Sequence, residues 1–161
     1  MAPWLALAAG VVVLDQVTKY WIHQTLTHGR VIEVLPLLNL VLVYNPGAAF
    51  SFLSDQPGWQ KNFFIAVAVI ASVWVVYLLS RYSHRWLFSL ALALILGGAI
   101  GNVIDRMIFG AVIDFIDLHV AGYHWPAFNV ADSAITCGAA LLIMESFRKH
   151  EAGGVSEAPA K

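Results

Sequence analysis

The sequence predicts an all-α integral membrane protein, in which four transmembrane helices carry a small extracytoplasmic β-element between the first two. Hydrophobic residues make up 60% of the chain and charged residues only 12%, whereas soluble domains carry about 25% charged residues. Four separate apolar segments are also long enough to cross a bilayer, which takes about 20 helical residues. We therefore expect a single four-span domain at about residues 1–150.

The four expected spans are residues 3–22, 59–79, 86–104 and 130–147. An even number of spans places both chain ends on the same side of the membrane. The short loop between the second and third spans carries Arg81 and Arg85, which makes that side cytoplasmic by the positive-inside rule. Residues 151–161 are polar or small, so we expect a disordered cytoplasmic tail.

The loop between the first two spans contains "RVIEVLPLLNLVLVYN", residues 30–45. Its Val, Leu and Ile residues, interrupted by Pro36 and Asn39, are typical of short strands. We expect a β-element at about residues 30–55, resting on the outer face of the membrane.

Carboxylates close to the ends of the spans are the features that most need explaining. Each costs roughly 2.5 to 3.5 kcal/mol at membrane depth. The expected topology brings all of them toward the extracytoplasmic side, and they are Asp15, Asp105, Asp114, Asp117 and Asp132. A lone Asp at a helix start is commonly a cap, but a single polar site explains most of the five together.

Amide and basic side chains accompany these acids at helical spacing. Asn102 shares a helix face with Asp105 and Arg106, and Asn129 precedes Asp132 by three residues. These groups would converge on the same layer as the carboxylates.

Two further spacings favour close helix packing. Gly97 and Gly101 form a small-xxx-small pair, which lets helices approach closely. Asp15 and Lys19 lie four residues apart in the first span, where they could form an internal ion pair.

Three chemistries are possible for such a site. His119 and His124 could ligate a metal, but the chain has no HExxH or CxxC motif, so we expect no metal and no cofactor. Ser133 adjoins Asp132 without an obvious His or Lys base, which disfavours a serine nucleophile. Cys137 is interpreted as a small packing residue.

Paired aspartates need only two carboxylates brought close together. Like charges cannot both ionise easily, so one keeps its proton, and the pair supplies an acid and a base near neutral pH. Spacing makes Asp114 with Asp132 plausible, and it leaves Asp105 with Asp132 open as well.

Five motifs occur in a fixed order along the chain: "VLDQVTK", "YNPGAAFSFL", "GGAIGNVIDR", "VIDFID" and "AFNVADSAI". In this order and in a four-span frame they resemble the bacterial lipoprotein signal peptidases, also called signal peptidase II. The resemblance covers about residues 10 to 147. It implies a membrane-embedded aspartic endopeptidase that removes signal peptides from diacylglyceryl-modified prolipoproteins, cutting just before the lipidated cysteine.

The resemblance also assigns roles to individual residues. It implies that Asp114 and Asp132 are the catalytic aspartates. The positions that it implies for substrate binding are Asn45, Gly47, Asn102, Arg106 and Asn129. Asp15, Lys19 and Asp105 match positions with a structural or supporting role.

The implied setting is the bacterial inner membrane, with both termini cytoplasmic and the active site toward the extracytoplasmic face. The expected partners are prolipoprotein substrates and membrane lipids, and we expect a monomer. A net charge of −1 argues against a nucleic-acid partner. The alternative function is a small proton- or ion-coupled transporter, because membrane carboxylates often relay protons.

Overall fold

The computed structural model describes residues 1–47 and 59–154, with side chains up to residue 148. Its four long helices are α1 (Ala2–Thr25), α2 (Trp59–Tyr82), α3 (Trp86–Phe109) and α4 (Val130–Gly154). All four are long and apolar enough to cross a membrane, which confirms the predicted spans. The helix α4 continues to Gly154, and the rest of the expected tail, residues 155–161, lies outside the described residues.

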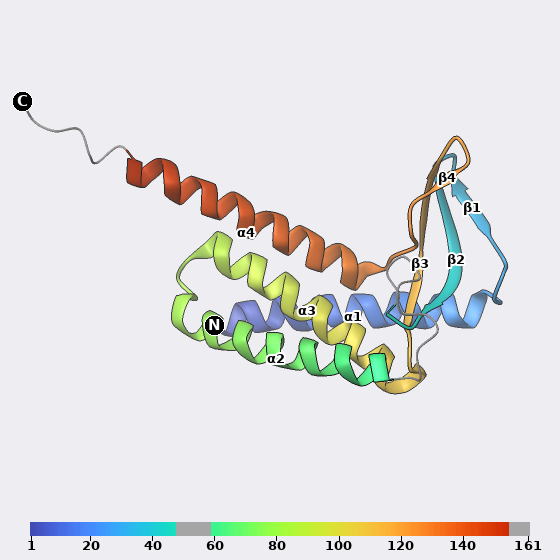
Figure 1. The fold of residues 1–161 in the computed structure, drawn as a ribbon, viewed down its shortest axis with the longest axis horizontal. Coiled ribbons are helices and arrows are strands. Elements are labelled where there is room, and N and C mark those ends of the chain that lie inside the picture. The colour runs from blue at the N-terminus through green and yellow to red at the C-terminus, as the bar shows by residue number, and fades with distance from the viewer. Residues whose placement is uncertain (48–58, 155–161) are drawn as a thin grey trace, which may run out of the picture.

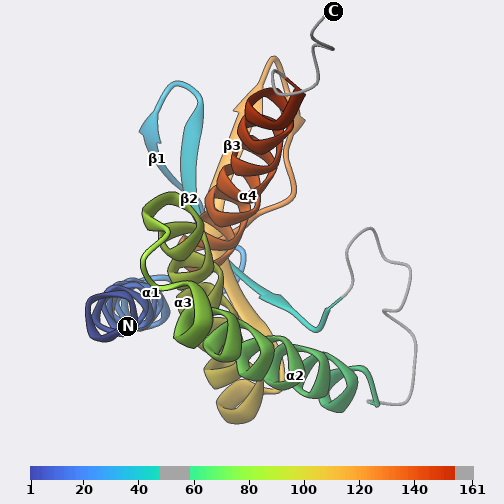
Figure 2. The same ribbon diagram turned by 90° about the vertical axis from the view of Figure 1, so that its left-hand side faces the viewer.

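The central helix of the bundle is α3. Half of its apolar window is buried, whereas at most 22% of the corresponding window is buried in any other span. It contacts α1, α2 and α4, and Figure 2 shows these three helices arranged around it. The outward faces of α1 and α2 expose large apolar side chains such as Val13, Ile70 and Val73, as expected for surfaces that face lipid.

Glycines explain how closely the helices pack around α3. A Cβ atom at Gly97 would lie 2.7 Å from the carbonyl oxygen of Ala8 on α1, and one at Gly101 would lie 2.6 Å from Oδ2 of Asp15. On the other side, a Cβ atom at Gly98 would collide with the backbone of Ala131 on α4. The predicted close approach through Gly97 and Gly101 is confirmed.

Four strands form an antiparallel sheet at one end of the helices (Figure 1). The strands β1 (Ile32–Leu35) and β2 (Leu38–Asn45) come from the loop after α1, as the sequence predicts. The strands β3 (Val112–Val120) and β4 (Tyr123–His124) come from the loop between α3 and α4, and the spatial order is β1-β2-β3-β4. Half of the sheet therefore comes from a loop in which the sequence analysis foresaw no strand. The expected β-element extended to residue 55, and its part beyond residue 47 lies outside the described residues.

The sheet is anchored to the helices by an apolar cluster. Ile113 and Phe115 of β3 and Leu42 of β2 pack against Ile22 and Leu26 at the end of α1. The first four residues of β3 are all buried. This packing fixes the start of β3 beside the ends of α1 and α3.

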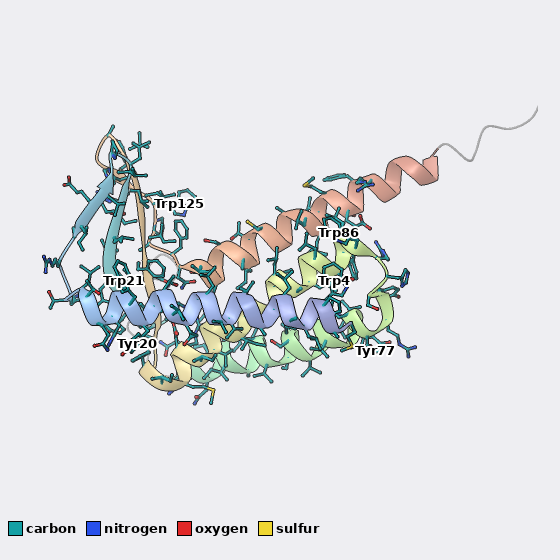
Figure 3. The ribbon with its side chains drawn as sticks, turned by 180° about the vertical axis from the view of Figure 1, so that it is seen from behind. Trp4, Tyr20, Trp21, Tyr77, Trp86 and Trp125 are labelled. Carbon is teal, nitrogen blue, oxygen red and sulfur yellow. The ribbon has the colours of Figure 1, made fainter. Side chains whose placement is uncertain are left out.

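Aromatic side chains gather at the two ends of the helices. Figure 3 shows Tyr20, Trp21 and Trp125 toward the end that carries the sheet, and Trp4, Tyr77 and Trp86 toward the opposite end. Such belts mark the two membrane interfaces, so the sheet lies at one interface.

Candidate active site

The chain brings Asp114 and Asp132 together by pairing Phe128 with β3. Phe128 accepts hydrogen bonds from the amides of Phe115 and Ile116 and donates one to the carbonyl of Ile116. Phe128 thus runs along the edge of β3 opposite β2. Since α4 begins two residues later, Asp132 in its first turn comes close enough to Asp114 on the strand for their charges to interact.

Asn129 connects the two acids directly. Its side-chain Nδ2 donates to Oδ1 of Asp114 at 2.7 Å, and its Oδ1 accepts the backbone amide of Asp132 at 2.9 Å. Its own backbone amide donates to Oδ2 of Asp132 at 3.3 Å. Asn129 is therefore both the cap of α4 and a bridge between the two carboxylates.

Asn45 holds the other oxygen of Asp114. Its Nδ2 donates to Oδ2 of Asp114 at 2.9 Å, and its Oδ1 accepts the amide of Gly47 at 2.9 Å. The φ angle of Gly47 is 108°, in the left-handed region that favours glycine. A Cβ atom there would also collide with the ring of Phe64 on α2. Gly47 thus fixes the orientation of the Asn45 amide, while the rest of the motif, residues 48–53, lies outside the described residues.

Asn102 and Arg106 reach the same site from α3. Asn102 Nδ2 donates to Oδ1 of Asp132 at 2.8 Å. The guanidinium of Arg106 interacts electrostatically with Asp132 and Asp114 and lies 5.1 Å from the ring centre of Phe64. Its Nε is buried and has no hydrogen-bond partner among the described residues.

A buried ion cluster lies directly behind these residues. Lys19 Nζ lies 2.8 Å from Oδ2 of Asp15 and 2.9 Å from Oδ2 of Asp105, and all three side chains are at most 2% exposed. Asp15 accepts the amide of Ala131 on α4, and Asp105 accepts the amide of Ile113 on β3. The predicted Asp15–Lys19 pair is confirmed. The alternative pairing of Asp105 with Asp132 is not formed, because Asp105 is committed to Lys19.

Sequence reasoning missed Gln16 as a member of this cluster. Its Nε2 donates to Asp105 at 2.9 Å and lies 3.2 Å from both Asp15 Oδ2 and the carbonyl of Gly101. Its position between Asp15 and Lys19 in "VLDQVTK" was the available signal.

The electrostatics distinguish Asp114 from an ordinary carboxyl. Burial raises the pKa of Asp114 to about 7, and the negative charge of Asp132 raises it further, against the lowering effect of Asn45 and Asn129. At neutral pH this carboxyl is therefore close to half protonated. One carboxyl of the pair can therefore act as an acid while the other acts as a base.

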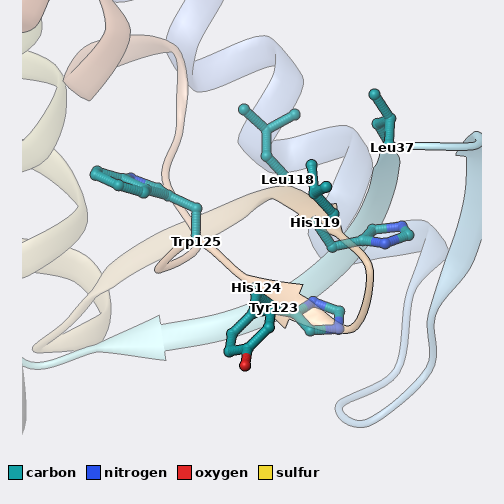
Figure 4. Close-up of a pocket in the computed structure, with 7 residues that line it drawn as sticks. Leu37, Leu118, His119, Tyr123, His124 and Trp125 are labelled. Atoms are coloured by element: carbon teal, nitrogen blue, oxygen red, sulfur yellow. The ribbon is translucent and has the colours of Figure 1, made fainter.

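The other polar residues of the β3–β4 hairpin form a separate group. Asp117 is buried rather than solvated; burial raises its pKa, but the hydrogen bonds from His124 and Asn39 lower it by more. His119 and His124 stack at 5.1 Å between ring centres and line an apolar hollow of about 430 Å³ with Tyr123 and Trp125 (Figure 4). Among the described residues, no three His, Cys, Asp or Glu side chains are placed to hold a metal ion.

The candidate nucleophiles have other roles. Ser133 Oγ donates to the carbonyl of Asn129 at 2.9 Å, as part of the first turn of α4. Cys137 is exposed rather than packed, which corrects the interpretation of this residue. Together with Asp132 and Ser133 it lines a mostly apolar groove of about 550 Å³ along α4.

Comparison with known proteins decides the family. The family model described as signal peptidase II matches residues 7–148. The chain belongs to the signal peptidase II family. Two relatives named lipoprotein signal peptidase, from Janthinobacterium sp. (strain Marseille) and Burkholderia thailandensis, are 54% and 53% identical over 92% of this chain and 90% of their own length.

Solved structures agree with this assignment. A bacterial membrane enzyme solved by the in meso method at 2.3 Å has a TM-score of 0.84 and 35% identity, covering 100% of this chain and 96% of its own. A second bacterial membrane enzyme, solved by the same method at 1.9 Å, has a TM-score of 0.80 and 37% identity. The match covers 90% of this chain and 92% of that chain. Membership of the signal peptidase II family indicates a multi-pass bacterial membrane protease. It favours a protease over the alternative function, a proton- or ion-coupled transporter.

Proposed function

We propose that the protein is an aspartic endopeptidase that removes signal peptides from diacylglyceryl-modified prolipoproteins, cutting just before the lipidated cysteine. The observation that carries the proposal is the sharing of Asn129 by Asp114 and Asp132 at one membrane interface. The names of the relatives support a prolipoprotein substrate.

The proposed mechanism uses one proton shared between the two acids. Asp114, with its pKa near 7, is the better proton holder, and Asp132 acts as the base. Asp132 takes a proton from water while the water oxygen bonds to the scissile carbonyl carbon, and Asp114 protonates the carbonyl oxygen. The carbon–nitrogen bond of the resulting diol then breaks as the proton on Asp132 passes to the leaving amine. Asp114 takes a proton from one hydroxyl of the diol, which leaves the new carboxyl group and restores the starting state of the pair.

The remaining polar residues stabilise the reacting groups or position the acid pair in this scheme. Arg106 offers its positive charge, close to both acids, to the developing oxyanion. Asn45 and Asn129 hold the carboxyl of Asp114 in place. A lipid-anchored substrate has its cleavage bond near the interface, which matches the depth of the acid pair.

The topology completes the proposal. Arg81 and Arg85 lie in the α2–α3 region at the end opposite the sheet, so that end and both termini are assigned to the cytoplasm. The acid pair then faces the extracytoplasmic side of the inner membrane, where the protein acts as a monomer among lipids.

Cleavage of a synthetic diacylated prolipoprotein in detergent tests the proposal. Asp114→Asn and Asp132→Asn should each abolish cleavage while the variants keep the helical circular dichroism of the parent protein. Asp117→Asn is the matched control, since Asp117 lies on the same strand but bonds to Asn39 and His124. Near-normal cleavage by either of the first two variants would refute the assignment.

A further inference from the structure

Both ends of the Asn102 side chain are engaged inside the protein. Its Oδ1 accepts a hydrogen bond from Lys19 Nζ at 3.0 Å and lies 3.3 Å from the donating Nδ2 of Asn129. Its Nδ2 donates to Asp132 at 2.8 Å. Asn102 is 8% exposed, so little of it remains for contact with a substrate, contrary to the role that the sequence resemblance implies.

Lys19 determines which way this amide points. An ammonium group only donates hydrogen bonds, so the oxygen of Asn102 must face it. A flipped amide would place its NH2 group against the Lys19 ammonium and its oxygen against the carboxylate of Asp132. Both of those contacts are repulsive, and the flip is therefore prevented.

Lys19 itself cannot move away from this position. It is 2% exposed, and the carboxylates of Asp15 and Asp105 hold it from two helices. Those carboxylates accept the amides of Ala131 and Ile113, which lie one residue from Asp132 and Asp114 respectively. The cluster thus joins the two backbone segments that carry the acids.

We propose that Lys19 is a positioning residue for catalysis, which acts through the amide of Asn102 to keep a hydrogen-bond donor on Asp132 and so hold that side chain as the ionised base. This inference rests on the proposed aspartic mechanism. It assigns Lys19 a role in the reaction beyond the stability of the bundle, and it assigns Asn102 to the acid pair instead of the substrate.

The relay runs from Lys19 through the Asn102 amide to Asp132, and the charged groups that face it can be named for the described residues. Asp15 and Asp105 balance Lys19, and Arg106 faces Asp132 and Asp114 from α3. Tyr20 and His23 line a small hollow of about 130 Å³ beside Lys19. Lys19 also acts on the second acid directly, because its positive charge opposes the burial that raises the pKa of Asp114.

The test measures kcat and KM against pH for three variants with a diacylated prolipoprotein peptide. Asn102→Leu removes the relay and leaves the ion cluster intact. Its kcat should fall about 10- to 100-fold, as for the loss of a hydrogen bond to a charged group. The acidic limb of its pH profile should move to higher pH, because the variant no longer places a hydrogen-bond donor on the carboxylate form of the base.

Lys19→Met should move the acidic limb of the pH profile in the same direction. If Lys19→Met does not fold, Asn102→Leu still tests the inference. Gln16→Leu is the matched control, because it removes a neutral member of the cluster that does not contact Asn102. It should lower the Tm and leave the pH profile unmoved.

Two outcomes would overturn the inference. A raised KM with an unmoved pH profile in Asn102→Leu would assign Asn102 to substrate binding. If the pH profile of Gln16→Leu shifts as far as that of Asn102→Leu, loosened packing of the cluster would explain the effect instead. Loss of cleavage in Asp114→Asn and Asp132→Asn, measured in parallel, shows that such a failure concerns the relay alone. Retained cleavage in those variants would refute the proposed function instead.

Discussion

The side-chain amide of Asn129 donates to the carboxyl of Asp114 at 2.7 Å in a buried hydrogen bond. Asn129 is fully buried and Asp114 is 2% exposed, so water cannot replace either partner. The first residue belongs to the start of α4 and the second to β3, and their contact holds together two elements that are joined by a loop.

Replacing Asn129 with Leu should therefore impair catalysis by more than it impairs folding. The variant loses the side-chain hydrogen bonds to the carboxyl of Asp114 and to the backbone amide of Asp132. We expect cleavage to fall by about 100-fold or more. Asn39→Leu is the matched control, because Asn39 is a buried amide that donates to Asp117 at 2.9 Å on the same sheet. It should lose similar stability and keep its activity; equal losses of activity in both variants would contradict the role of Asn129.

The raised pKa of Asp114 predicts how stability depends on pH. The folded protein holds this proton up to about pH 7, whereas the unfolded chain releases it near pH 3.8. The proton's contribution to stability is therefore fully present below pH 3.8 and is lost as the pH rises through 7. Asp114→Asn keeps a neutral group at every pH, so its Tm relative to the parent should rise from pH 4 to pH 8.

The corresponding change in the free energy of unfolding is at most about 4 kcal/mol, at 1.36 kcal/mol for each pKa unit. It is read from thermal unfolding in detergent at a series of pH values. A difference in Tm that stays constant between pH 4 and pH 8 would show that the carboxyl ionises normally.

Gly101→Ala should destabilise the bundle by about 1 to 3 kcal/mol, because its new methyl group would meet the Asp15 carboxylate. Gly10→Ala is the matched control in α1, since a Cβ atom there meets nothing within 4 Å. Its stability should be unchanged or slightly higher. Thermal unfolding of both variants decides the point, and equal Tm values would contradict the close approach of α1 and α3.

The activity should be insensitive to metal chelators. The candidate site is built from carboxylates, amides and one guanidinium, and this chemistry needs no Lewis acid. Cleavage measured with and without EDTA should proceed at equal rates. Loss of activity with EDTA that zinc restores would instead favour a metal enzyme and would direct attention to His119 and His124.

The membrane orientation can be tested with single cysteines. In a Cys137→Ala background, His28→Cys places a thiol in the exposed loop after α1, and His84→Cys places one in the exposed loop between α2 and α3. A membrane-impermeant maleimide added to intact spheroplasts should label only the first. Labelling of only the second would reverse the assigned orientation.

The sequence alone determined the four spans, because a membrane helix must present a long apolar run whatever it packs against. It also determined the strands of the first loop, whose Val, Leu and Ile content is visible without any partner. Its motifs further indicated the family that the comparisons confirm. The ion pair of Asp15 with Lys19 followed from helical spacing.

Only the tertiary structure decided how the polar residues are paired. The strand β3 was not apparent because "VIDFIDLHV" carries two acids, and the pairing with β2 and Phe128 that makes it a strand is non-local. Spacing could not tell Asp105 from Asp114 as the neighbour of Asp132. That choice depends on Lys19, which holds Asp105 on one side of α3, and on β3, which carries Asp114 to the start of α4.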